Sequence, residues 1–133
     1  MEKKLVVTAK DAVTGSMQKG GVTFRMYIDE PRCGAKNFSL LQNSLKAGAI
    51  SSEHKHDVES CWYFLSGKGT IRIRGESFRV GPHTAAFVPA GAMHQVQADP
   101  GEDLDYLMIY APGGPEQEIL KQAASGKSDP YKK

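Results

Sequence analysis

Short segments in which apolar and polar residues alternate recur along the chain, separated by glycine and proline. Ile71 and Ile73 alternate with Arg72 and Arg74, the period of two that places apolar side chains on one face of a β-strand. Many short strands between closely spaced turn residues are typical of a β-sandwich or barrel. The predicted strands are Leu5–Thr8, Val22–Ile28, Asn37–Leu45, Ala49–His56, Cys61–Leu65, Thr70–Arg74, Phe78–Val80, Ala85–Val88, Gln95–Ala98 and Leu104–Tyr110.

One segment, Pro115–Ala124, has a helical pattern instead. Pro115 suits the first turn of a helix, and Glu116 and Glu118 would lie at the positive end of the helix dipole. The residues that follow, Ser125–Lys133, are predicted to form a frayed tail. The chain is therefore predicted to be all-β with a short C-terminal helix.

The length and composition favour one globular domain. The chain has 133 residues, 40% of them hydrophobic and 24% charged, as in an ordinary soluble protein. Its 17 basic and 15 acidic side chains give a net charge of +2, and it has no basic run, so nucleic acid is not a predicted partner. Without a repeat or linker, we predict a single domain over 1–133, with a first strand region at 1–30, core motifs at about 40–110 and a helix and tail at 115–133.

The sequence also predicts no membrane span and no export. The longest stretch without Asp, Glu, Lys or Arg, Val80–Ala98, contains prolines, glycines and histidines that a lipid-spanning helix would not collect. The first residues lack the long apolar core of a signal peptide. The expected location is cytoplasmic, where Cys33 and Cys61 would be reduced thiols.

The histidines supply the candidate chemistry. His54 and His56 are two residues apart, which places both imidazoles on one face of an extended strand. His94 follows the tight turn Val88–Gly91 and can close a site from the opposite side if the strands are neighbours in a barrel. Three neutral imidazoles would suit Fe, Mn, Zn, Ni or Cu, although His-x-His taken alone is a weakly specific signal.

Two ordered motifs resemble those of the cupin family. The first is Gly48, five residues, His54-Lys55-His56 and later Gly67, and the second runs from Gly81 through Pro89-Ala90-Gly91 to His94. The resemblance covers about residues 40–110. It implies a double-stranded β-helix, which is a small jelly-roll barrel. It also implies one divalent metal, Fe or Mn before Zn, Ni or Cu, held by these three histidines in a protein that is often a homodimer.

The chain departs from the family pattern at the carboxylate ligand. The Glu that cupins place six residues before Gly67 is Ser60 here, and Glu59 stands one residue earlier. In a regular strand Ser60 would share the face of the two paired histidines and Glu59 would point away, but a bulge could turn Glu59 inward. Two alternatives follow: Glu59 is a fourth ligand, or the site has three histidines and Glu59 is a solvated carboxylate.

Neighbouring residues have less specific roles. Trp62 and Phe64 share the parity of Ser60 and are predicted to pack in the barrel interior, whereas Cys61 has the opposite parity and is predicted to be a buried structural thiol. His83, which stands where cupins commonly have a small residue, is predicted to be a rim histidine in a turn.

The resemblance also points to strands that face the cavity in cupins. Arg25, Tyr27 and Gln42 lie on such strands and are candidates for orienting a substrate. Glu59, if it is not a ligand, and Tyr27 or Tyr63 are the candidates for a general base.

A six-coordinate metal with three histidine ligands keeps positions open for a bidentate substrate and, on Fe(II), for dioxygen. The sequence therefore predicts a metal-dependent cupin that acts on a small molecule, with dioxygenation as the first reaction type. An isomerase or lyase that uses the metal as a Lewis acid is the alternative, and so is a sugar- or metabolite-binding protein without activity. Leu5–Thr8 is a candidate strand for the sheet edge of a second copy in a homodimer.

Overall fold

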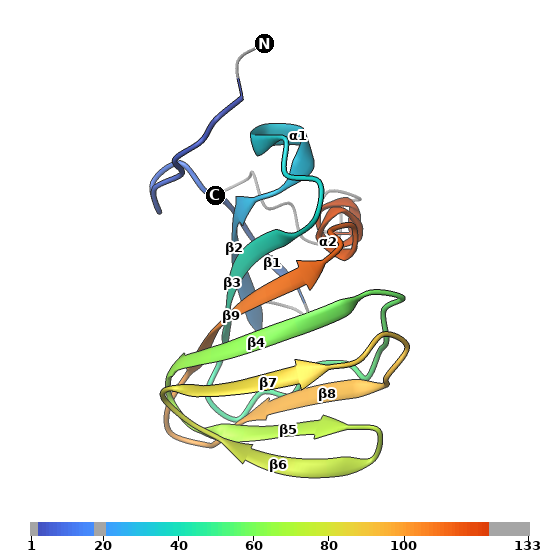
Figure 1. Cartoon of the computed structure of the whole chain (residues 1–133). Helices are drawn as coiled ribbons and strands as arrows, with labels where there is room; N and C mark the ends of the chain where they lie inside the picture. Colours follow the sequence, from blue (N-terminus) through green and yellow to red (C-terminus); the bar gives the residue numbers. More distant parts are fainter. Residues whose placement is uncertain (1–2, 18–20, 123–133) are drawn as a thin grey trace.

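The chain forms two antiparallel β-sheets, and both helices lie at the same end of the larger sheet (Figure 1). The structure, a computed structural model, describes residues 3–17 and 21–122. One sheet has six strands in the order β1-β2-β3-β9-β4-β7, and the other has three in the order β6-β5-β8. The elements are β1 (Val13–Met17), β2 (Val22–Ile28), α1 (Glu30–Cys33), β3 (Ser39–Leu45), β4 (Glu59–Ser66), β5 (Gly69–Ile73), β6 (Glu76–Val80), β7 (Thr84–Val88), β8 (His94–Ala98), β9 (Leu104–Ala111) and α2 (Pro115–Gln122).

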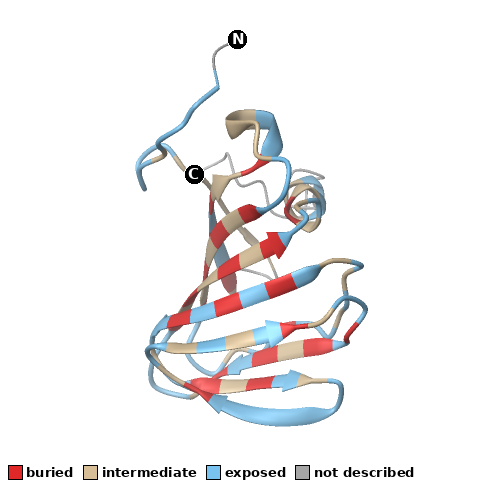
Figure 2. Ribbon diagram, viewed as in Figure 1, coloured by how far each residue is buried: buried red, intermediate tan, exposed pale blue. Residues whose placement is uncertain are grey.

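Alternation along the strands creates the core. In β9 every second residue from Leu104 to Tyr110 is buried, and Figure 2 shows the same banding on the neighbouring strands. Met108 lies directly opposite Leu41 of β3 and Trp62 of β4, and residues opposite one another point to the same face of a sheet. Ile71 of the second sheet belongs to the same apolar cluster, so the core lies between the sheets. The predicted all-β fold with a short C-terminal helix is confirmed.

Two glycines allow the β4–β5 turn to lie against the backbone of its neighbours. A Cβ on Gly69 would stand 2.2 Å from the Gln97 carbonyl oxygen, and one on Gly67 would stand 2.0 Å from that of Asp103. Gly67 also has φ of +82°, in the left-handed region that other residues avoid. The close approach therefore requires glycine at both positions.

Helix α2 is attached to the six-stranded sheet by buried polar groups. Glu116, 3% exposed, accepts hydrogen bonds from the Ser39 hydroxyl at 2.8 Å and from the Gly114 amide at 2.8 Å. The next residue, Gln117, donates its amide to Asp29 at 2.9 Å. Asp29 is fully buried and is the N-cap of α1, where its side chain also accepts hydrogen bonds from the backbone amide and the guanidinium of Arg32. These bonds tie both helices to the ends of β2 and β3.

Two predicted strands are wrong. Residues 3–8 form no strand, and Leu5 and Val6 are 83% and 77% exposed, because the described part of the chain offers this short run no strand to pair with. The homodimer that this segment was expected to support stays a prediction.

The segment Ala49–His56 makes only isolated bridges, Ile50 with Gln97 and His54 with His94. Its centre, Ser51–Glu53, is polar and has no alternation to hold a regular strand.

Two elements were not predicted. β1 has the sequence Val-Thr-Gly-Ser-Met, which carries little apolar alternation, and it forms because β2 supplies an edge that pairs from Val13 to Met17. α1 is a single turn that begins after the Asp29 cap and ends at Gly34, which has φ of +79°. The predicted helix Pro115–Ala124 is present as Pro115–Gln122, and the predicted tail 125–133 lies outside the described residues.

The prediction for Cys61 is also wrong in part. Its parity is opposite to that of Trp62, as expected, but its side chain is exposed because nothing among the described residues covers the outer face of β4. Cys61 and Cys33 are both free thiols.

Among the described helices, none has the length and apolar character that crossing a membrane requires.

Candidate metal centre

His54, His56 and His94 converge at one end of the space between the sheets. One ring nitrogen from each lies within 4.8 Å of those of the other two. The ring centroid of His54 lies 4.9 Å from that of His56 and 4.4 Å from that of His94. The centroids of His56 and His94 are 5.5 Å apart. The three histidines that the sequence singled out are thus brought together.

Backbone bonds between two distant segments hold this arrangement. The His54 amide donates to the His94 carbonyl at 3.1 Å, and the His94 amide donates back to the His54 carbonyl at 2.8 Å. The Gly91 amide donates to the His56 carbonyl at 2.7 Å. The irregular segment after Gly48 is therefore fastened to the turn before β8, and this pairing places the imidazoles together.

The hydrogen bonds of the rings define which nitrogen is free. His54 Nδ1 lies 2.9 Å from the Ser52 carbonyl oxygen, and His94 Nδ1 lies 3.0 Å from that of Ala92. Because a carbonyl only accepts, Nδ1 carries the proton in the neutral form of each of these two rings, and Nε2 then keeps a lone pair. Nε2 of His56 and Nε2 of His94 are buried without a hydrogen-bond partner among the described residues. Orphaned buried nitrogens of this kind fit metal ligands. In His94 the other ring nitrogen is also held by a carbonyl, as in the ring orientation typical of metal-binding histidines.

Burial also keeps the imidazoles of His56 and His94 neutral. Desolvation, with repulsion from His54 and His94, lowers the pKa of His56 to about 4. Desolvation lowers the pKa of His94 as well, against the opposing effect of its bond to Ala92. Neutral imidazole is the form that binds a metal, so at neutral pH these two rings are ready to act as ligands.

The depressed pKa of His56 predicts that the chelated protein loses stability in mild acid. Its pKa is about 4 in the folded chain against 6.5 for an unperturbed imidazole, so between these values the unfolded state binds more protons. The free energy of unfolding must then fall as the pH falls from 6.5 towards 4. Urea denaturation in EDTA at pH 7 and pH 5 measures this loss. His56→Gln should lose less over the same interval, and an equal loss in both proteins would exclude His56 as the cause.

Aromatic side chains of β4 and β9 contact the histidine rings from the inner side. The Tyr110 ring lies 5.2 Å from that of His56, and the Trp62 ring lies 5.6 Å from that of His94. Trp62 stacks on Tyr106 at 5.0 Å with the planes 7° apart. Burial raises the pKa of Tyr106 to about 12 and raises that of Tyr110 further, so both phenols remain protonated at neutral pH. Tyr110 was not predicted, although its alternation with Leu104–Met108 signals an inward position.

Glu59 does not join the imidazoles. It lies opposite Ala111 on the exposed face of β4, and the pairing with β9 runs without interruption to Phe64. The bulge that would turn it inward is therefore absent, and Ser60, 3% exposed, takes the inward position. Glu59 as a ligand or general base stays a prediction that this placement does not support, because the regular strand directs its side chain to the outer face.

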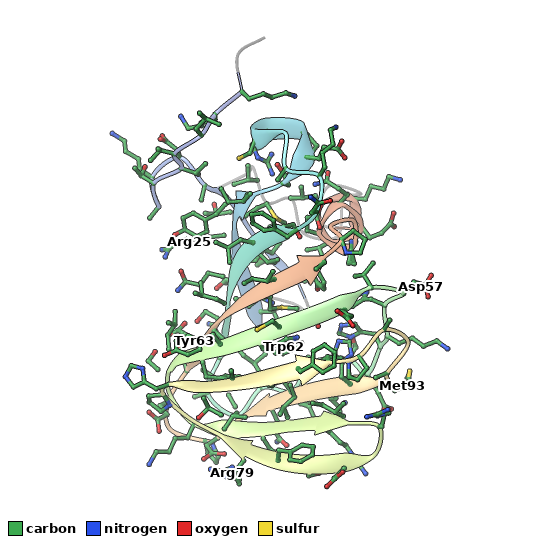
Figure 3. The ribbon with its side chains drawn as sticks, in the orientation of Figure 1. Arg25, Asp57, Trp62, Tyr63, Arg79 and Met93 are labelled. Carbon is green, nitrogen blue, oxygen red and sulfur yellow. The ribbon has the colours of Figure 1, made fainter. Side chains whose placement is uncertain are left out.

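Other predicted site residues also lie elsewhere. Arg25 and Gln42 are paired on the outer face of the six-stranded sheet, and Figure 3 shows Arg25 directed away from Trp62 and the metal centre. Tyr27 is half-buried at the register shift of β2, and β3 and β9 separate this strand from β4. Tyr27 is thus no member of the histidine cluster. His83 occupies an exposed turn, as predicted, with Nδ1 3.1 Å from the Tyr63 hydroxyl on the outer face.

Comparison with known proteins gives one family and several similar structures. Residues 43–110 match the family model Cupin_2, described as a cupin domain. An uncharacterised protein of Streptomyces coelicolor is 29% identical over 77 residues, which are 58% of this chain and 72% of that protein. The polyketide cyclase RemF of Streptomyces resistomycificus is 28% identical with a TM-score of 0.71 over 86% of this chain and 82% of its own. Oxalate decarboxylase of Bacillus subtilis, which has Mn(II) centres, is 23% identical with a TM-score of 0.71 over 86% of this chain and 31% of its own.

Proposed function

Because the chain belongs to the cupin domain family, we propose that it is an enzyme that holds one divalent metal through Nε2 of His54, His56 and His94 and acts on a small molecule. The observation that carries the proposal is the convergence of three ring nitrogens within 4.8 Å, two of them from imidazoles with depressed pKa values. Imidazole suits Fe, Mn, Zn, Ni and Cu, and we place Fe and Mn first.

Dioxygenation is the reaction type that the residues favour. His54, His56 and His94 would hold iron(II) through three imidazoles, and the ion would then supply sites for a substrate and for dioxygen. No carboxylate belongs to the histidine cluster among the described residues, so a reaction that depends on a carboxylate base lacks that group. Trp62, Tyr106 and Tyr110 keep water from the inner side, whereas His54 and His56 are only half-buried and mark the side from which a substrate enters.

Cyclisation without oxygen is a second candidate, and the similarity to the polyketide cyclase RemF favours it. A bound dication would then supply Lewis acidity to a carbonyl oxygen of the substrate. In this alternative the chain contributes the three histidine ligands and the aromatic side chains beside them. The Tyr110 and Ser60 hydroxyls are the inward polar groups in that layer.

One experiment separates the two reaction types. The protein is purified without a chelator or histidine tag, its metals are determined by elemental analysis, and oxygen uptake is measured on diols, diketones and thiols. Near-stoichiometric iron with substrate-dependent oxygen uptake supports a dioxygenase. Stoichiometric zinc, nickel or manganese without oxygen uptake favours the cyclase. Absence of metal even after reconstitution would contradict the proposed site.

A further inference from the structure

Ser60 lies in the layer of side chains next to the histidine cluster. It points inward from β4, is 3% exposed, and lies directly opposite Tyr110 of β9. The Tyr110 ring contacts His56, and the ring of Trp62, which is bonded to Ser60, contacts His94. The cross-strand neighbour of Ser60, Tyr110, and its hydrogen-bond donor, Trp62, thus each contact a different histidine of the cluster.

The bond from Trp62 determines the direction of the Ser60 hydroxyl. The indole Nε1–H of Trp62 lies 3.0 Å from Ser60 Oγ, and an indole can only donate. Ser60 Oγ is therefore the acceptor, and its own proton is directed elsewhere. In the part of the chain that the structure describes, no group accepts that proton. A buried hydroxyl that is fixed by a donor and keeps an unused proton is prepared to donate to a ligand.

The charge of the cluster favours an anion as that ligand. The three histidines contribute no negative charge when neutral, and no Asp, Glu or Cys joins them among the described residues. A dication held there would keep its full charge in a partly buried place, where opposite charges attract more strongly than in water. A hydrogen bond to an anionic oxygen is also stronger than one to a neutral acceptor.

We propose that Ser60, held by Trp62, forms an anion-binding position beside the metal centre and donates its hydroxyl proton to an anionic oxygen of the substrate. The ligand class is a small molecule with a carboxylate, enolate or phenolate oxygen. The inference rests on the proposed function, because the three histidines must hold the dication that attracts the anion. Ser60 is a positioning residue: it fixes the oxygen that the histidine-bound dication attracts.

Anion titration of the cobalt(II)-loaded full chain tests this position. Acetate and azide serve as probes, and the visible spectrum of cobalt(II) reports their binding. Ser60→Ala should keep one cobalt per chain but weaken both anions about tenfold, which corresponds to the loss of one hydrogen bond to a charged group. Ser60→Thr keeps the hydroxyl and should restore both affinities to within about threefold of the unchanged protein.

Ser39→Ala is the matched control. Ser39 is also buried and also lies opposite Tyr110, on the other side of β9, but its hydroxyl donates to Glu116. Its replacement should leave anion affinity unchanged. Equal anion affinity in Ser60→Ala and the unchanged protein, with cobalt retained, would overturn the role of Ser60 and leave the metal site standing. Failure of the unchanged protein to bind cobalt would overturn both the metal site and this inference.

Discussion

His94→Ala is expected to abolish tight metal binding while both sheets remain folded. His94 is 1% exposed, its Nε2 is buried without a partner among the described residues, and its Nδ1–H is already used by the Ala92 carbonyl. The replacement removes one of the three proposed ligands, and no Asp, Glu or Cys among the described residues belongs to the cluster and could substitute for it. Removing an outer-shell partner alone costs about 10–100-fold in metal affinity, so loss of a ligand should cost more than about a hundredfold.

Elemental analysis after dialysis against metal-free buffer measures the loss, and circular dichroism reports whether the β-structure persists. His83→Ala is the matched control, because His83 lies in an exposed turn outside the cluster and bonds the Tyr63 hydroxyl and the Phe64 carbonyl. The control should retain one metal per chain. Unchanged metal content in folded His94→Ala would show that the ligand set is wrong.

Among the substitutions proposed for this chain, Asp29→Ala is expected to lower the free energy of unfolding most. The carboxylate is fully buried, caps the first turn of α1, pairs with the Arg32 guanidinium and accepts the Gln117 amide of α2. Its removal leaves the half-buried Arg32 without its partner and detaches one end of α2 from the sheet. Breaking a buried ion pair costs about 3–5 kcal/mol, and the position of Arg32, whose side chain is 30% exposed, favours the lower value of about 3 kcal/mol.

Urea denaturation of the chelated protein measures this loss without a contribution from metal binding. Glu30→Ala is the control, since Glu30 is the next residue and its carboxylate pairs with Lys36 on the surface. Its denaturation midpoint should not change measurably, because exposed ion pairs contribute little. If the two variants have the same midpoint, the buried network of Asp29 does not hold α2 and α1 to the sheet.

Much of the fold follows from local alternation, and the exceptions have identifiable causes. β2 has the predicted bounds Val22–Ile28, since its buried residues alternate cleanly with exposed ones. β1 was missed because its sequence has little periodicity of its own and depends on the edge of β2. α1 was missed because a single turn has no helical period, although Asp29 three residues before Arg32 is a capping signal.

The metal centre was predictable in its members but not in its construction. His54 and His56 were expected to meet on one face of a strand, yet their segment is irregular and the bonds to His94 and Gly91 bring them together. Strand parity correctly separated Ser60 from Glu59, because β4 is regular from its first residue. Tertiary contacts of this kind, and the carbonyls that orient the rings of His54 and His94, have no signature in a single sequence.

X-ray absorption of the zinc-loaded protein tests the metal centre most directly. If His54, His56 and His94 hold the ion through Nε2, the spectrum contains three imidazole nitrogens at about 2.0–2.1 Å, with the outer-shell scattering of three rings and no sulfur. His94→Ala protein should show at most two rings. A spectrum with one imidazole or none, or with sulfur from Cys33 or Cys61, would contradict the assignment of this site.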